Sequence, residues 1–308
     1  MDVSVGGHRG MGTTDDAHAQ SRVGNALKPA ESTIESIRGA FAAGAKFVEI
    51  DCIQTFDNVM RVTHSDNLAW HVFGPNPYNT VGETNSADLD SLLVGAGRKG
   101  HMPTLDQVLD EIKLTDAFNT SSFAINIELK NIREIEKGKF KLGPDSYYDC
   151  LADTIRNNGF PIDKIVFASF AARDLVEIKK RLPEAKTGFL FFDPIAGDGY
   201  GDEDDIYPGE GVENARYLKF TPENIDKVYG LVKFDYVHPQ IDSLTPATLT
   251  KVNEYGLGVN TWIWNEIPGQ NTKPIEDAIQ LASGYLPELG IITDDVAAMR
   301  QLATRVAP

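Results

Sequence analysis

The chain has 308 residues, which suits one large domain, because an α/β barrel alone uses about 250 residues. Its 45 acidic and 29 basic side chains give a net charge of −16 and a pI near 4.8. This balance excludes binding to nucleic acid or to an anionic membrane through bulk electrostatics. We expect a single domain over residues 1–308, in which any phosphate site is locally basic.

Cys52 and Cys150 are the only cysteines, so neither a disulfide framework nor a paired thiolate metal site is expected. No run of 18 apolar residues occurs, which argues against stable membrane insertion, and no basic start with an apolar stretch marks a signal peptide. The first predicted strand begins almost at Met1. This start favours an extracytoplasmic mature form whose targeting segment was removed, although a cytosolic protein could start the same way.

Short apolar runs alternate with helical patterns, which is the signature of βα units and a parallel sheet. Nine strands are predicted, at Val3–Gly7, Phe47–Gln54, Met60–His64, Phe123–Leu129, Ile165–Phe170, Thr187–Phe192, Tyr236–Gln240, Gly258–Trp264 and Gly290–Thr293. The interval 55–59 before the third strand is too short for a parallel crossover, which needs about a dozen residues. We therefore predict that the third strand returns antiparallel, as a hairpin on the second.

Without the hairpin arm, eight strands remain, the number that closes a barrel. Helices are predicted between them, at Ser32–Ala43, Thr104–Glu111, Ser146–Asn157, Arg173–Arg181, Pro222–Tyr229, Pro246–Tyr255, Pro274–Ser283 and Val296–Thr304. Helix starts are marked by a threonine before proline, as at Thr221-Pro222 and Thr245-Pro246. The predicted fold is an α/β protein of the (β/α)8 TIM-barrel type.

The segment 66–103 is too long for an ordinary loop of such a barrel and is rich in Gly, Pro, Asn and aromatic residues. We predict a small inserted cap beside the active-site mouth. The loop 11–28 is given no role. The acidic loop 193–213 is predicted to be solvated or to act as a lid.

Glu49 and Asp51 lie two residues apart on the second predicted strand, so strand alternation points both side chains to one side. Two carboxylates directed into a barrel mouth repel each other unless a cation lies between them. Glu128 and Lys130 repeat the spacing on the next parallel strand. Glu128 would complete an oxygen site for a hard divalent cation, and a buried Glu128–Lys130 ion pair is the plainer alternative.

His8 and His64 end predicted strands beside these carboxylates, where one imidazole can act as base and the other as acid. Arg9 ends the first strand at the same mouth. His238 lines the pocket or packs in the core. The remaining histidines are predicted to be solvated in loops: His18, His71 and His101. The inventory suits metal-assisted cleavage of a phosphate ester, with carboxylates on the ion, imidazoles moving protons and cations on the phosphate.

At these positions the chain resembles the glycerophosphodiester phosphodiesterase family. The family's HRG, PENT-like, ExD, HD, PTL, ExK, WTxN and ITD elements correspond to His8-Arg9-Gly10, Ala30-Glu31-Ser32-Thr33, Glu49-Ile50-Asp51, His64-Ser65-Asp66, Pro103-Thr104-Leu105, Glu128-Leu129-Lys130, Trp262-Ile263-Trp264-Asn265 and Ile292-Thr293-Asp294. The similarity spans nearly the whole chain. It departs from the pattern where Ser65 interrupts the HD element and in the PENT-like element.

The resemblance implies hydrolysis of a small glycerophosphodiester to glycerol 3-phosphate and an alcohol, with one divalent cation, Mg²⁺ or Ca²⁺. The roles implied are metal binding by Glu49, Asp51 and Glu128, acid–base catalysis by His8 and His64, phosphate binding by Arg9 and Lys130, a place near the metal or beside Arg9 for Glu31, and packing against the alcohol for Trp262. The nucleophile is either water or an adjacent hydroxyl of the substrate.

Two other functions remain open. A lipid-active relative, of the lysophospholipase D or phosphatidylinositol-cleaving kind, would need exposed apolar residues at the mouth, for which Trp70, Phe73 and Tyr78 are candidates. A non-catalytic phosphate-binding module is the third hypothesis, although all the candidate catalytic groups are present.

Overall fold

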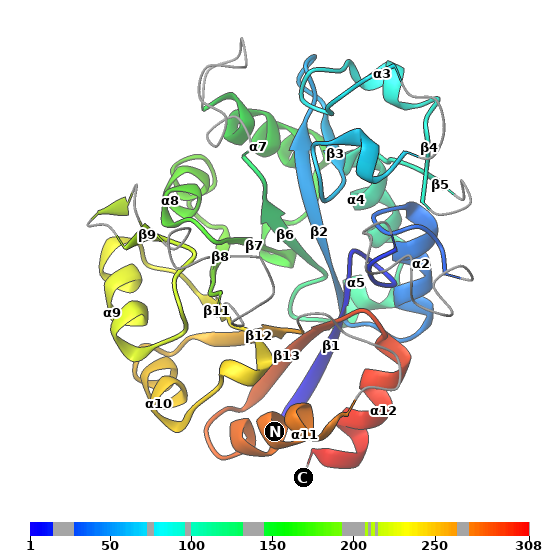
Figure 1. The fold of residues 1–308 in the computed structure, drawn as a ribbon. Coiled ribbons are helices and arrows are strands. Elements are labelled where there is room, and N and C mark those ends of the chain that lie inside the picture. The colour runs from blue at the N-terminus through cyan, green and yellow to red at the C-terminus, as the bar shows by residue number, and fades with distance from the viewer. Residues whose placement is uncertain are drawn as a thin grey trace.

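The computed structural model describes residues 1–14, 28–72, 77–95, 100–131, 145–192, 207–208, 211–212, 215–263 and 271–307. Its centre is a barrel of parallel strands with helices packed around the outside (Figure 1). The barrel strands are β1 (Asp2–His8), β2 (Phe47–Gln54), β6 (Ile125–Leu129), β7 (Ile165–Ser169), β8 (Lys186–Leu190), β11 (Tyr236–His238), β12 (Gly258–Trp262) and β13 (Glu288–Thr293).

Consecutive barrel strands are neighbours, and β1 pairs with both β2 and β13, which closes the ring. The additional strand β3 (Met60–Val62) pairs antiparallel with β2. The predicted (β/α)8 TIM barrel with a hairpin on its second strand is therefore confirmed. The hairpin arm is shorter than predicted and ends at Val62 rather than His64. One more bond to β2 follows, from the Thr63 amide to the Asp51 carbonyl, and beyond it the Ser65 amide donates to the His71 side chain instead of to β2.

The helices on the outside are α2 (Ile34–Ala42), α4 (Leu105–Lys113), α5 (Asp116–Thr120), α7 (Ser146–Asn158), α8 (Ala172–Arg181), α9 (Pro222–Leu231), α10 (Pro246–Tyr255), α11 (Lys273–Ser283) and α12 (Val296–Val306). Local sequence explains their ends. Thr221 and Thr245 cap α9 and α10 with their hydroxyls, and a proline follows each. Gly256 ends α10 with a φ of 66°, a conformation that suits glycine. The short helix α5 was not predicted, and Thr115 caps it.

Strand alternation separates the apolar core from the barrel interior. Ile50 and Cys52 of β2 join the large apolar cluster between the barrel and its helices. Phe47, on the opposite face of the same strand, packs against Phe123 with ring centroids 4.6 Å apart. These two rings belong to a separate apolar cluster with Val166. Because Glu49 and Asp51 follow Phe47 on its face of β2, they lie above an apolar floor and toward the carboxyl ends of the strands.

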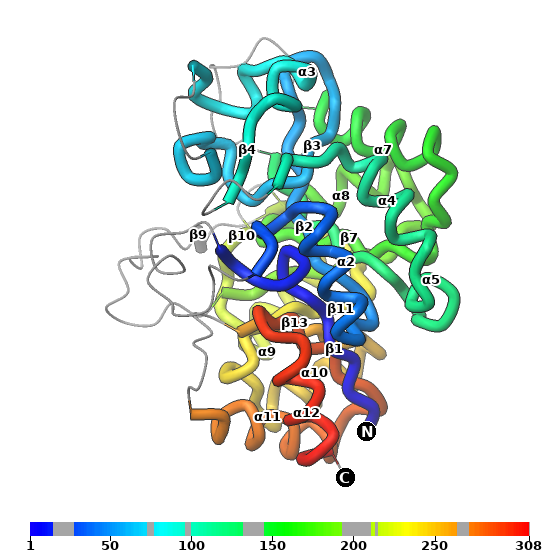
Figure 2. Tube along the Cα trace, turned by 90° about the vertical axis from the view of Figure 1, so that its right-hand side faces the viewer, coloured from blue at the N-terminus to red at the C-terminus, as the bar shows by residue number. Residues whose placement is uncertain are grey.

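The 66–103 segment lies at the end of the molecule away from both termini (Figures 1 and 2). Its described parts include η2 (Leu68–Trp70), α3 (Ser86–Leu89), β4 (Leu93–Val94) and β5 (Gly100–His101). The buried side chain of Arg61 on β3 holds the segment by donating to the carbonyl oxygens of Ser86 and Met102. The segment shares a small apolar cluster with the hairpin and the chain before α2: Ala30, Ile53, Leu68, Val81, Leu89, Leu92, Val94 and Met102.

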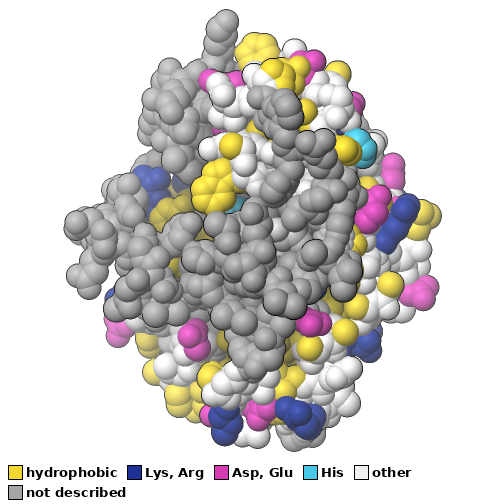
Figure 3. All heavy atoms as spheres, turned by 45° about the vertical axis from the view of Figure 1, so that its right-hand side comes forward, with side chains coloured by type: hydrophobic (Ala, Val, Ile, Leu, Met, Phe, Trp, Pro, Cys, Tyr) yellow, Lys and Arg dark blue, Asp and Glu magenta, His cyan; other side chains and the backbone are white. Residues whose placement is uncertain are grey.

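Charged side chains of both signs are dispersed over the described surface in Figure 3. Trp70 is 47% exposed, Tyr78 packs against the apolar cluster of the 66–103 segment, and Phe73 lies outside the described residues. Most of the loops 11–28 and 193–213 also lies outside them, together with their predicted roles. Within the described chain, no helix combines the length and apolar character needed to cross a membrane.

Candidate active site

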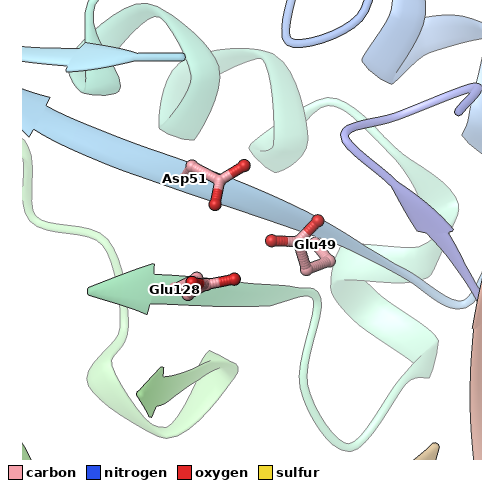
Figure 4. A group of neighbouring side chains, drawn as sticks. All are labelled: Glu49, Asp51 and Glu128. Carbon is pink, nitrogen blue, oxygen red and sulfur yellow. The ribbon is translucent and has the colours of Figure 1, made fainter. Parts of the chain in front are cut away.

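Three carboxylates meet where β2 and β6 run side by side. Glu49 and Asp51 project from β2 toward Glu128 on β6 (Figure 4), and the strand register places Asp51 opposite Glu128. One oxygen from each of the three lies within 4.8 Å of the others. The predicted common direction of these side chains is therefore confirmed by the geometry. Oxygen atoms so close together suit a hard divalent cation such as Mg²⁺ or Ca²⁺.

The electrostatics of this cluster also fit a cation. Asp51 is 1% exposed, and within the described chain neither of its carboxylate oxygens accepts a hydrogen bond. The Oε1 atom of Glu49 is in the same state. Burial and then the charge of Asp51 raise the pKa of Glu49 to about 8, and burial is the largest cause that raises the pKa of Glu128. A bound cation would relieve both the desolvation and the mutual repulsion.

Two basic side chains border the carboxylates, as predicted. Arg9 Nε lies 3.4 Å from Asp51 Oδ2, and its Nη1 donates to Glu31 Oε1 over 2.8 Å. Lys130 Nζ lies 3.3 Å from Asp51 Oδ1 and also pairs with Glu128. The ion pair that was the plainer alternative for Glu128 is thus present alongside the carboxylate cluster. Two cationic side chains thus face the three carboxylates of Glu49, Asp51 and Glu128, so the site is not basic overall and its positive charge is confined to the edge of the cluster.

The backbone around Arg9 is strained in a way that fixes its direction. Arg9 has a φ of 47°, which is uncommon for any residue with a side chain. Its amide donates to Glu49 Oε2 over 3.1 Å, and its carbonyl accepts from the amide of Ser32. These two contacts hold the turn after β1, so that the guanidinium faces the carboxylates. Such strain is typical of functional sites.

His8, at the end of β1, is held by a residue that was not predicted as part of the site. Its Nδ1 donates to Asp294 Oδ1 over 2.7 Å, while its Nε2 lies 3.9 Å from Glu49 Oε2. Burial and Arg9 lower the pKa of His8, but the hydrogen bond and charge of Asp294 outweigh them and raise it to about 9. Asp294 also accepts from the hydroxyl of Thr13. The only sequence signal for Asp294 was the ITD element after the last strand.

His64 lies in the turn after β3, two residues past its end, and its surroundings oppose protonation. Burial, then the charges of Arg9 and Lys130, hold the pKa of His64 well below its usual range. His8 and His64 therefore differ in proton affinity, as an acid–base pair requires. The neighbouring His71 was predicted to be solvated, and this prediction is wrong, because its side chain is only 4% exposed. The 66–103 segment folds back and buries it.

Aromatic side chains gather along another part of the barrel rim. Trp262 ends β12, and its indole Nε1 donates to the carbonyl of His238 over 3.1 Å. Phe192 stacks on Trp262 with an interplanar angle of 6°, and Phe170 meets Trp262 edge-on. Tyr217 in turn stacks on Phe170. This aromatic group, defined by Phe170, Phe192, Tyr217 and Trp262, follows the rim from β12 to β7, the neighbour of the strand that carries Glu128.

His238 packs inside the barrel, and no described contact joins it to the carboxylates. It is fully buried, its Nδ1 lies 3.4 Å from Asn126 Nδ2, and its ring occupies the space that a side chain on Gly188 would need. Burial lowers the pKa of His238 to about 3, so the ring is neutral. The sequence allowed His238 either to line the pocket or to pack in the core, and the structure shows it packed in the barrel interior.

Parallel barrels carry their active sites at the carboxyl ends of the strands, and the groups gathered there are those needed to bind and cleave a phosphate ester. The fold and site thus define a TIM-barrel phosphodiesterase. The chain belongs to the glycerophosphoryl diester phosphodiesterase family, whose sequence model matches residues 8–298. This confirms the resemblance seen in the motifs and identifies an enzyme of the glycerophosphodiester phosphodiesterase class.

Solved structures share the fold at low sequence identity. An Oleispira antarctica phosphodiesterase in complex with the product sn-glycerol-3-phosphate is 18% identical, with a TM-score of 0.63 and coverage of 98% of this chain and 96% of that one. A glycerophosphodiester phosphodiesterase from Agrobacterium tumefaciens is 17% identical, with a TM-score of 0.62 and coverage of 97% and 100%.

A Galdieria sulphuraria protein, proposed to be a glycerophosphodiester phosphodiesterase, is 16% identical, with a TM-score of 0.68 and coverage of 98% of both chains. No curated protein sequence matches this chain.

Proposed function

We propose that the protein hydrolyses a glycerophosphodiester to glycerol 3-phosphate and an alcohol, with a divalent cation at Glu49, Asp51 and Glu128. The observation that carries this proposal is the buried carboxylate cluster, in which Asp51 accepts no hydrogen bond within the described chain and lies beside two cationic side chains. The Oleispira antarctica structure, which holds sn-glycerol-3-phosphate on the same fold, supports a product of this size and charge.

The cationic side chains bind the phosphate. When bound, a divalent cation supplies positive charge to the phosphoryl oxygens and makes the phosphorus a better electrophile. Arg9 and Lys130 each lie beside a different oxygen of Asp51, so both can reach oxygens of a phosphate held over the cluster. Glu31 accepts from the Arg9 guanidinium and thereby orients it. Charge that develops in the transition state is stabilised by these fixed groups without reorganisation.

The histidines transfer the protons. One imidazole of the pair formed by His8 and His64 takes a proton from the attacking oxygen, which belongs to water or to an adjacent substrate hydroxyl. A new P–O bond forms, the P–O bond to the alcohol breaks, and the other imidazole protonates the departing oxygen. Attack by water gives glycerol 3-phosphate directly, whereas attack by the substrate hydroxyl gives a cyclic phosphate, which water then opens in a second step with the roles of the two imidazoles exchanged. The opposite pKa shifts of the two rings support this division of labour.

The alcohol part of the substrate packs against Trp262 and the aromatic group around it. The indole is fixed by its hydrogen bond to the His238 carbonyl, so it offers a rigid apolar surface. A long acyl chain would also find exposed apolar surface at Trp70 in the 66–103 segment. The exposure of Trp70 is the observation that supports a lysolipid as the second candidate substrate.

The test measures glycerol 3-phosphate release from glycerophosphocholine by the purified protein, with and without excess EDTA. We expect turnover that EDTA abolishes and that added Mg²⁺ or Ca²⁺ restores, because the proposal assigns the cation at Glu49, Asp51 and Glu128 the task of neutralising charge on the phosphoryl oxygens. Full turnover in EDTA would refute the metal proposal. Faster cleavage of a long-chain lysophosphatidylcholine than of glycerophosphocholine would favour the lipid-active alternative. Phosphate binding without any turnover would favour the non-catalytic phosphate-binding module.

A further inference from the structure

His71 is a buried histidine that takes no part in the mechanism above, although it lies beside the site. It belongs to the 66–103 segment and follows η2, whose first turn is capped by Asn67 through a hydrogen bond from the Ala69 amide. The His71 amide donates to the Leu68 carbonyl over 3.2 Å. This tight turn brings the imidazole back against Ser65, six positions earlier in the chain.

The contact with Ser65 fixes the chain next to His64. The Ser65 amide donates to Nε2 of His71 over 3.0 Å, so that nitrogen carries no proton. On the other side of His64, the Thr63 amide donates to the Asp51 carbonyl over 3.0 Å. The two residues that bracket His64 are therefore tied to different parts of the site, one to the carboxylate strand and one to the inserted segment.

The rest of the turn is anchored to the same segment. The carbonyl and the side chain of Asp66 accept from the amides of Val81 and Gly82, over 2.9 and 2.7 Å. The Asn67 amide donates to the Ser65 hydroxyl. Within the described chain no side-chain hydrogen bond fixes the His64 ring, so its placement depends on the backbone on either side.

His71 also lies close to two groups of the site. One is Glu31, which pairs with Arg9, and the other is His64. The imidazole therefore borders both the proton-transfer side and the phosphate-binding side of the site.

We propose that His71 is a positioning residue, which holds the turn of His64 through the Ser65 amide and so couples the 66–103 segment to turnover. This inference rests on the proposed role of His64 in proton transfer. A His71→Leu substitution removes Nε2, the acceptor of the hydrogen bond from the Ser65 amide. A His71→Gln substitution can restore an acceptor, because Gln Oε1 can take the place of Nε2.

The experiment compares kcat and KM for glycerophosphocholine in the wild type, H71L, H71Q and H101L. We expect kcat to fall about tenfold in H71L, the factor set by one buried hydrogen bond, while KM changes less than about threefold. H71Q should recover most of the loss. His101 is exposed in the same segment, so H101L should match the wild type. Equal losses in H71L and H71Q, or none in H71L, would overturn the proposal.

A second measurement does not depend on the variants or on activity. In ¹⁵N-labelled wild-type protein, a scalar coupling across the hydrogen bond should join the Ser65 amide nitrogen to Nε2 of His71. A protonated Nε2 without that coupling would refute the contact itself. A wild type that shows the coupling but no hydrolysis would instead refute the proposed function.

Discussion

The two histidines of the site are positioned in different ways. His8 ends a barrel strand, and its ring is held directly by Asp294, which follows the neighbouring strand β13. His64 lies beyond the end of the hairpin, and the amides on either side of it are held by Asp51 and by His71. One side of the site is thus built by the parallel strand ladder, and the other depends on an inserted segment. A barrel can supply part of a site rigidly and leave another part to its insertion.

The charges differ in the same way. The carboxylate of Asp294 raises the pKa of His8, whereas burial and the nearby cationic side chains lower that of His64. On the side of the barrel strands, called here the ladder side, Asp294 therefore favours the protonated form of His8. On the hairpin side, the surroundings of His64 favour its neutral form. The contrast is what an acid–base pair needs, and it arises from the different surroundings of two identical side chains.

The largest expected effect comes from removing either ring. His8→Ala and His64→Ala should each lower kcat about 10²-fold or more, the usual scale for an acid–base group. Steady-state hydrolysis of glycerophosphocholine measures this, with His101→Ala as an exposed control. A near-normal kcat in one variant would show that only one side of the site transfers protons.

A smaller effect is expected from the support of the ladder side alone. Asp294→Asn removes the charge that holds His8, so kcat should fall about 10- to 100-fold, in line with the loss of a hydrogen bond to a charged group. Asp295→Asn makes the same chemical change one residue on, at the cap of α12, and should leave kcat unchanged. If the two variants behave alike, Asp294 does not position His8.

The smallest effect on turnover is expected from a substitution of His238, which is buried inside the barrel and belongs to neither histidine's surroundings. Its folded pKa of about 3 lies below the ordinary value of 6.5, so only the unfolded chain binds a proton between these values. The stabilisation by neutral His238 is complete above pH 6.5 and is lost as pH falls toward 3. Between pH 6.5 and 5 this amounts to about 2 kcal/mol of the free energy of unfolding.

His238→Asn, which cannot titrate, should therefore lose less stability than the wild type over that range in urea unfolding. Its turnover at neutral pH should remain near normal. A pH dependence identical to that of the wild type would show that His238 is not held neutral, and a large loss of kcat would place it in the substrate pocket.

Much of the ladder side could be predicted from the sequence. The two-residue spacing of Glu49 and Asp51 fixes a common direction, and the strand ends around His8 and Glu128 follow from apolar runs and turn residues. Asp294 was visible only as part of a motif, because nothing local shows that its side chain turns to a histidine 286 positions away. His71 gave no signal at all, since the irregular 66–103 segment has no periodicity from which burial follows.

The sequence by itself determined the eight barrel strands and their hairpin arm, the common direction of the polar groups on β2 and β6, and most of the chemical groups at the rim. These properties depend on short-range periodicity, which is written into consecutive residues. Tertiary structure alone decided that Asp51 lies opposite Glu128, that Asp294 reaches His8 and that His71 reaches the turn of His64. Such contacts require barrel closure and the folding back of the insertion, so they depend on the packing of distant segments.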